Sequence, residues 1–327
     1  MRILSKNRKL WLDNQVAKET KLLVKAAAHR HSQRLRGKSK IFNKTSIIQI
    51  PRLLVAERFE NRKELHAAIW SGHQHLNKGP GSRVKFDFSK VEKVFPGGML
   101  FLLAHLELLS ELYPNRIRAS CTPNSVCAQL FCHFGNSRLL GSTRTKVSHE
   151  SVKNWHYRTG THADGQKIAS LLDHYRTITS VEPPENLYDV LAEALTNVKH
   201  HAYPAYSETP EMLKRWWLFS RFLEPTGTRD GSLFIAVYDL GVGIPDTMRR
   251  RLRAGELIHD KADELLKIFG SDAGGNLDRL LLQRAIEHPR SSTGLSHRGK
   301  GLPEMRDFVL TTKTGRLYIV SESPRLY

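Results

Sequence analysis

The feature that most constrains the fold of this chain is a short apolar run that ends in an aspartate and two glycines. Leu233–Tyr238 is rich in β-branched and aromatic residues, which favours a strand. Asp239-Leu-Gly-Val-Gly-Ile244 follows at once, and glycine tolerates positive φ and lets the backbone approach a flat ligand closely. The run therefore predicts a strand whose end faces a ligand. Taken alone, it fits a tight surface turn capped by an aspartate equally well.

A helix is predicted upstream, beginning near Pro183-Pro184-Glu185, because proline and an acidic first turn are typical of helix starts. Its apolar residues recur at helical spacing, as expected of one buried face: Leu187, Leu191, Leu195 and Val198. Glu193 and Asn197 fall off this stripe and lie one turn apart on the same helix face. A carboxylate and an amide so placed suit a water-activating base beside a magnesium ligand, although such pairs are also common on solvated helix faces.

A third motif, Gly299-Lys-Gly-Leu302, lies at the start of another predicted helix. Backbone N–H groups and the positive end of a helix dipole at such a turn attract phosphate. Two common phosphate motifs are absent, because neither GxxxxGK[ST] nor GxGxxG after a strand occurs. Each of the three motifs is weak alone, and their order along the chain is the informative feature.

The order ExxxN, then DxGxGI, then GxGL before a helix resembles the GHKL ATPase family, whose Bergerat fold is shared by gyrase-type ATPases, Hsp90, MutL, histidine kinases and anti-sigma-factor serine kinases. The resemblance covers roughly residues 181–323. It implies an α+β chain with a C-terminal Bergerat-type α/β sandwich, in which helices cover one face of a mixed sheet. The cofactors it implies are ATP and Mg²⁺.

The resemblance also implies a role for each motif residue. Asn197 would ligate magnesium, and Glu193 matches the general base of the hydrolysing and serine-kinase branches. Asp239 would contact adenine. The other residues that would bind ATP, by shaping the pocket for the base or by receiving the phosphates, are Gly241, Gly243, Ile244, Arg298, Gly299, Lys300, Gly301 and Leu302. Sensor histidine kinases usually carry a different residue at the Glu193 position, which favours hydrolysis or serine phosphorylation over histidine autophosphorylation.

Two departures from the family pattern concern the end of the sequence. Arg316 follows Gly315 where the family often has a threonine. Family members usually add another strand after the segment Leu317–Ser323, so we expect a short sheet or an edge that a partner completes. Residues 246–297 occupy the place of the family's ATP lid, and we expect hinge-like freedom at 273–276, a helix at 277–287 and a mobile flap at 291–296.

The middle of the chain, residues 46–148, has a strand–helix–strand–helix order. A strand is expected at 84–89, a break at Pro96-Gly97-Gly98, a helix at 99–112, a strand at 116–121 and a helix at 125–134. This region resembles the STAS domain of anti-sigma-factor antagonists, although an unrelated α/β domain is the alternative. The phosphorylatable serine of that family is replaced by the segment Phe95–Gly98, so we expect a docking element without a phosphoswitch.

Charge is concentrated at one end of the chain, whose formal net charge is +19. Residues 1–44 hold 13 Lys and Arg against two acidic residues, which is +11 of that total. We expect residues 1–45 to form a basic arm that binds nucleic acid, an anionic membrane surface or an acidic protein, unless it is a solvated tail. Residues 149–180, polar with one helix-like patch at 168–175, are expected to link the middle domain to the ATPase domain at 181–327.

Other features bear on location and function. No apolar run of about 18 residues, no secretory signal and no disulfide framework occur, so we expect a cytoplasmic protein. Together with the two resemblances, we expect a bacterial one. Three function classes stay open. They are an ATP-dependent switch with slow hydrolysis, an anti-sigma-factor-type serine/threonine kinase, and a nucleic-acid-binding regulator with a structural ATP site. Intact Glu193 and Asn197 favour the first two, and a homodimer is compatible with each.

Overall fold

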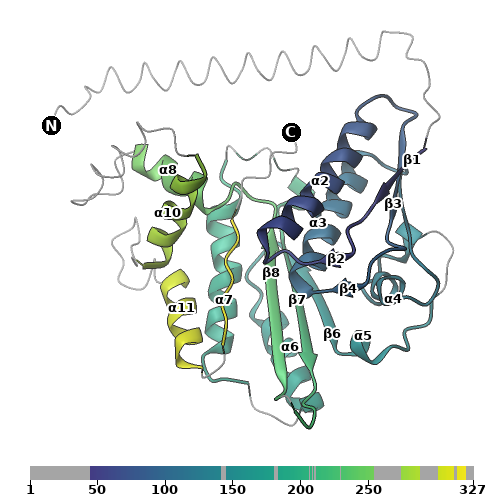
Figure 1. Ribbon diagram of the computed structural model, residues 1–327. Coiled ribbons are helices and arrows are strands. Elements are labelled where there is room, and N and C mark those ends of the chain that lie inside the picture. Colours follow the sequence, from purple (N-terminus) through teal and green to yellow (C-terminus); the bar gives the residue numbers. More distant parts are fainter. Residues whose placement is uncertain are drawn as a thin grey trace, which may run out of the picture.

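The computed structural model describes residues 45–140, 145–179, 183–253 except 206, 208, 210 and 229, 274–287, 301–312 and 315–321. The fold is mixed α/β with several small sheets (Figure 1). The expected basic arm, most of the expected lid, and Arg298, Gly299 and Lys300 of the phosphate motif lie outside these residues. No helix within the described ranges is long and apolar enough to cross a membrane.

The N-terminal part is built on a parallel three-stranded sheet of order β1-β3-β5. Its strands and the short parallel pair beside it are β1 (Thr45–Gln49), β3 (Arg83–Asp87), β5 (Ile117–Ser120), β2 (Leu53–Leu54) and β4 (Lys93–Val94). The helices of this part are α2 (Phe59–Leu76), α3 (Pro96–Leu112), α4 (Val126–His133) and η1 (Ser137–Leu140). The predicted strand–helix–strand–helix order is therefore present.

Helix α3 begins earlier than expected, because Pro96-Gly97-Gly98 is its first turn and not a break. Proline suits the first helical position, where its missing N–H would have no intrahelical partner. Gly98 serves close packing: a Cβ there would lie 2.2 Å from the carbonyl oxygen of Leu54 on β2. The helix thus starts in direct contact with the neighbouring strand, and its residues from Met99 to Leu109 are nearly all buried.

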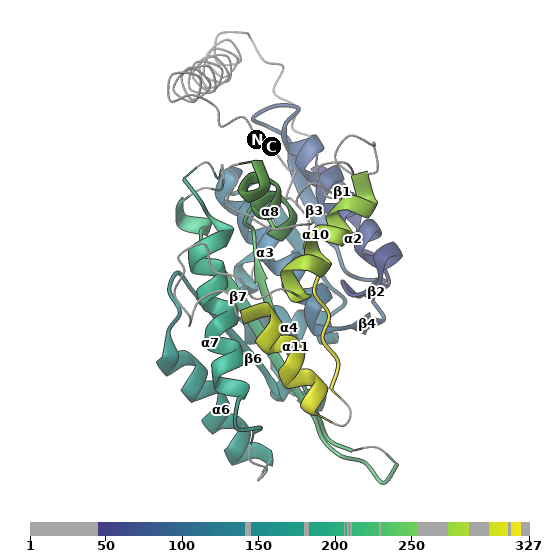
Figure 2. The same ribbon diagram turned by 90° about the vertical axis from the view of Figure 1, so that its left-hand side faces the viewer.

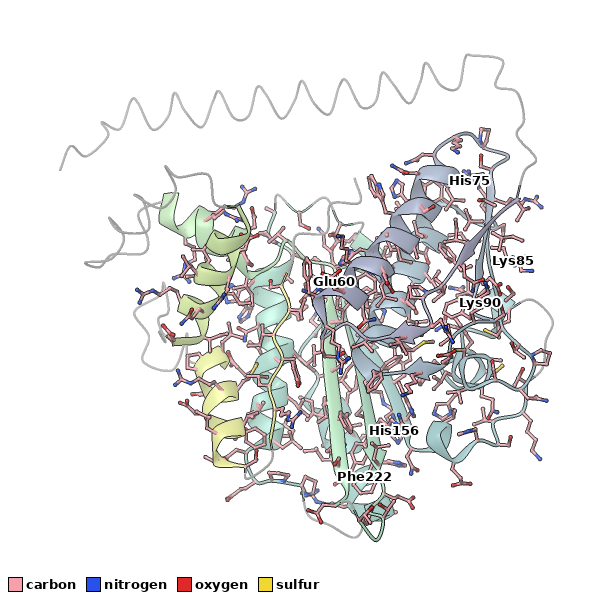
Figure 3. All side chains as sticks on the ribbon, viewed as in Figure 1. Glu60, His75, Lys85, Lys90, His156 and Phe222 are labelled. Atoms are coloured by element: carbon pink, nitrogen blue, oxygen red, sulfur yellow. The ribbon has the colours of Figure 1, made fainter. Side chains whose placement is uncertain are left out.

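The C-terminal part is built on an antiparallel sheet of order β6-β7-β8. Its strands are β6 (Trp155–Gly160), β7 (Trp216–Leu223) and β8 (Ser232–Asp239), and nearby short elements are α5 (Glu150–Lys153) and η3 (Glu211–Leu213). The expected linker at 149–180 therefore contributes strand β6 and helix α6 (Gly165–Thr179) to this layer. His156 and Phe222 lie toward the hairpin end of the sheet (Figure 3).

Both faces of this sheet are covered, which explains the continuous apolar run at the start of β7. Trp216 and Leu218 pack with α6 and α7 (Leu187–Asn197) in one hydrophobic core. Trp217 and Phe219 point the other way and share a core with α3. Since successive strand residues face opposite sides, a strand buried on both faces has no polar alternation. The N-terminal and C-terminal sheets are thus joined through α3.

The remaining helices lie on the α7 side of the sheet (Figure 2). They are the π-helix η2 (Val198–Ala202) directly after α7, α8 (Ile244–Arg253), α10 (Gly274–Glu287) and α11 (Gly301–Thr311). The predicted helix at 277–287 is present, but it starts at Gly274, so residues 274–276 form its first turn and not a hinge. Residues 315–321, near the expected last strands, belong to no sheet of the described chain.

Candidate functional site

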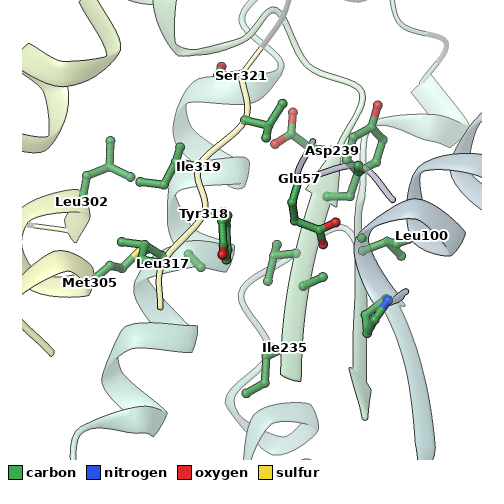
Figure 4. Close-up of a pocket in the computed structure, with 18 of the residues that line it drawn as sticks. Glu57, Leu100, Ile235, Asp239, Leu302, Met305, Leu317, Tyr318, Ile319 and Ser321 are labelled. Carbon is green, nitrogen blue, oxygen red and sulfur yellow. The ribbon is translucent and has the colours of Figure 1, made fainter. Parts of the chain in front are cut away.

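A cavity of about 2000 Å³ lies between α7, α11 and one edge of β8, and it extends to the wall formed by β2, α2 and α3 (Figure 4). Several residues predicted from the three motifs line it: Asn197, Asp239, Gly241, Gly243, Ile244, Gly301 and Leu302. They come from three segments that are far apart in the sequence. All the residues that the sequence predicted to bind ATP, and that the structure describes, therefore line one cavity.

Glu193 lies beside this group, because the first residue of α11 packs directly on it. A Cβ built on Gly301 would lie 2.1 Å from Glu193 Oε1 and 2.5 Å from its Cδ. Such distances exclude any side chain at position 301 without displacement of the carboxylate or of α11. The glycine thus places the N-terminus of α11, where backbone N–H groups point out of the helix, next to the predicted base.

The surroundings of Glu193 raise its pKa above the ordinary value of 4.5. Burial is the main cause, and the negative charge of Glu304, one turn into α11, adds to it. His200 and the Asn197 side chain act in the opposite direction. Asn197 comes close enough for this effect, yet its buried Nδ2 makes no hydrogen bond of ordinary geometry in the described chain. A buried amide N–H without such a bond is costly, and a ligand that accepts one from it would remove that cost.

The loop after β8 forms the other end of the site. Asp239 Oδ1 accepts a hydrogen bond of 2.8 Å from the Gly241 N–H, while Oδ2 makes none with the described residues. Burial raises the pKa of Asp239, and the Gly241 bond opposes that shift. Gly243 has φ of +80°, a backbone conformation that glycine adopts at much lower cost than other residues. A Cβ on Gly241 would lie 2.4 Å from the Ala202 carbonyl oxygen, so this glycine lets the loop pack on η2.

Residues that the motifs do not contain hold this loop in place. The Leu240 N–H donates to Tyr203 Oη at 2.9 Å, and the Tyr203 hydroxyl donates to the Arg215 carbonyl at 2.6 Å. The Thr209 hydroxyl donates to the Leu240 carbonyl at 3.0 Å. The loop conformation is therefore set by residues that lie between η2 and β7. Nothing local to the DxGxGI motif indicated them.

The cavity is lined by more positive than negative side chains. Its basic lining residues are Arg58, Arg62, Lys93, Arg251, Arg284 and Arg316, against the acidic residues Glu57 and Asp239. Arg251 of α8 and Arg284 of α10 are among these lining residues. Burial is the main cause of the lowered pKa of His201 in η2, and the charges of His200 and Arg251 add to it. This balance suits an anionic ligand.

Asn197 is the predicted Mg²⁺ ligand. No group of three or more His, Cys, Asp or Glu side chains among the described residues is arranged to hold a metal. Magnesium, however, is usually held by one or two protein oxygens together with substrate phosphates and water. Asn197, which lines the cavity close to Glu193, offers one amide oxygen and is compatible with that mode. The donor set therefore fits a magnesium ion that arrives with a nucleotide.

Comparisons with known proteins add no further assignment. No protein-family description, no curated protein and no solved structure matches this chain.

Proposed function

We propose that this chain is a GHKL-type ATPase that binds Mg-ATP and acts as a nucleotide-gated switch. The observation that carries the proposal is the convergence of three sequence motifs on one cavity. Asn197 from α7, Asp239 and Gly243 from the end of β8, and Gly301 from α11 line a common space. Nothing in the spacing of these motifs along the chain requires such a meeting.

In this proposal the two parts of ATP occupy the two ends of the site. The adenine ring would lie beside Asp239, whose Oδ2 makes no hydrogen bond with the described residues and could accept one from an exocyclic amine. The phosphates belong at the N-terminus of α11, with Arg251 and Arg284 supplying positive charge. Bound magnesium would neutralise phosphate charge and polarise the bond to be broken.

Glu193 is the residue that this proposal places at the chemical step. Its carboxylate sits at Gly301, where the terminal phosphate would lie, and its raised pKa makes it a stronger base than a solvated glutamate. Asn197 lies close to the carboxylate, and Glu304 adds negative charge from α11. A water or a protein hydroxyl could be the acceptor, so a serine/threonine kinase uses the same residues.

The first experiment measures ATP binding to the purified chain by calorimetry in the presence of Mg²⁺. Asn197→Ala is expected to abolish measurable Mg-ATP binding, because it removes the amide at the centre of the site. Asn186→Ala is the matched control. Asn186 directly precedes the same helix, is exposed, and its side chain makes no capping hydrogen bond. Equal affinity in the two variants would rule out the proposed site. Phosphate release with and without added DNA or RNA then reports whether turnover responds to nucleic acid.

The pH dependence of hydrolysis offers a second test, of Glu193 itself. A base works only when deprotonated, so turnover should fall as the pH drops through the pKa of Glu193, which lies above 4.5. Glu304→Gln removes a neighbouring negative charge that raises this pKa, so the acid limb of the rate profile should move to lower pH. Asp307→Asn, an exposed change on the same helix, should leave the limb in place. A Glu304→Gln profile superimposable on the wild-type profile would contradict this role.

A further inference from the structure

Among the described strands, β8 has a partner on one edge only, and its other edge faces the cavity. β8 pairs with β7 along its full length, from Ser232 to Asp239, and no other described strand pairs with it. Most of β8 lines the cavity, and the side chain of Phe234 is 43% exposed. A long unpaired edge with exposed apolar residues is a template for another strand.

Residues 315–321, here named the C-terminal strap, form the opposite wall of the same cavity. The Ile244 N–H donates a hydrogen bond of 2.7 Å to Ser321 Oγ, which anchors the end of the strap just beyond the end of β8. The strap begins shortly after α11 and runs toward this anchor, in the same direction as β8 (Figure 1). Its direction therefore suits a parallel strand.

The side chains of the strap alternate in a way that matches the two faces of the sheet. Leu317 and Ile319 lie toward Leu302 and Met305 of α11, whereas Tyr318 lies on the side of β8 (Figure 4). Along β8, Ile235 and Val237 pack with the α6 and α7 core, and Ala236 and Tyr238 pack with the α3 core. Odd positions of both segments therefore face the layer that α6, α7 and α11 form on one side of the sheet.

The exposed apolar side chains of the strap and the size of the cavity both indicate that the strap can move closer to β8. Tyr318 is 60% exposed and Val320 is 45% exposed, although both are strong strand formers. The cavity of about 2000 Å³ exceeds the roughly 300–1,000 Å³ usual for a small-molecule site. If the strap paired with β8, its side chains would fill the excess volume of the cavity. The end of the cavity that Asn197 and Asp239 border would stay open.

We propose that the C-terminal strap closes on the free edge of β8 as a parallel fourth strand and forms one wall of the nucleotide site. Pairing satisfies the backbone groups of the edge, and it buries Tyr318 and Val320 against the α2 and α3 wall, where Phe95 is also exposed. The closure follows from the fold alone. Only its role as a wall of the nucleotide site rests on the proposed ATP function.

Cysteine pairs test the closure on the full chain without nucleotide. Tyr318→Cys is combined in turn with a cysteine at each position from 233 to 238 of β8 and oxidised, and the crosslinks are mapped by peptide mass so that Cys121, Cys127 and Cys132 cannot be confused with them. In a parallel pair, opposite residues point to the same face and lie within disulfide reach. Crosslinking is expected at an even-numbered partner, Phe234, Ala236 or Tyr238. Equal yields at odd and even positions, or none at any, would overturn the proposal.

Hydrogen exchange of the unmodified chain covers the case in which cysteine variants fail to fold. The amides of residues 316–320 are expected to exchange more slowly than those of an unstructured peptide, both with and without Mg-ATP. Ile319→Pro removes one donor and should release this protection, because proline cannot join a ladder. Unstructured-peptide rates in the wild-type chain would reject the strap. Slow exchange in a chain that binds no ATP would retain the strap and reject only the nucleotide function.

Discussion

Replacing Glu193 with glutamine is expected to leave Mg-ATP binding intact and to lower turnover by a factor of about 10²–10⁴, the usual contribution of a positioned general base. Glutamine keeps the size of the side chain, so the packing of Gly301 against position 193 is preserved. It cannot accept the proton of the attacking group. Phosphate release under saturating Mg-ATP, beside a calorimetric measurement of affinity, separates the two effects.

The control for this prediction is a carboxylate elsewhere on the same helix. Asp189→Asn changes charge in the first turn of α7, one turn before Glu193, at an exposed position that is not among the causes of the Glu193 pKa shift. It should change neither affinity nor turnover. If Glu193→Gln hydrolysed ATP at the wild-type rate, Glu193 would not be the base. If the wild-type chain bound ATP without turnover until a protein hydroxyl was supplied, the kinase alternative would replace hydrolysis.

Truncating Trp217 to alanine is expected to lower the free energy of unfolding by about 3–5 kcal/mol, the range for a large aromatic lost from a core. Trp217 is fully buried between β7 and α3, and its Nε1–H donates to Glu107 Oε2 at 2.9 Å. The change leaves a cavity and removes one of the two donors to Glu107, the other being the Tyr157 hydroxyl at 3.1 Å. Urea unfolding followed by circular dichroism measures the loss.

A second readout tests whether α3 joins the two sheets into one cooperative unit. Hydrogen exchange of peptides from β3 and from α7 should accelerate together in Trp217→Ala, because α3 belongs to the core that includes residues of both parts. Trp70→Ala is the matched control, since Trp70 is 42% exposed on α2 and its loss should cost far less. Acceleration confined to peptides of the C-terminal sheet would show that the parts unfold independently.

Local sequence patterns were sufficient to predict helices that bury one face and strands that end at residues typical of turns. The stripe at Leu187, Leu191 and Leu195 predicted α7 because a helix that buries one face repeats its apolar residues at that spacing. Strand β8 was predicted because its β-branched and aromatic run stops at an aspartate and two glycines. Strand β6 was missed, because Trp155–Gly160 is mostly polar and is held by its pairing with β7.

The sequence by itself determined which residue types carry the candidate chemistry and on which element each one lies. Only the tertiary structure decided that Glu193 meets Gly301 and Glu304, that α3 covers the far face of the C-terminal sheet, and that the C-terminal strap faces a free edge. The physical reason is range. Helix and strand periodicity acts between residues a few positions apart, whereas burial, pKa shifts and edge pairing depend on segments that the fold brings together from distant parts of the chain.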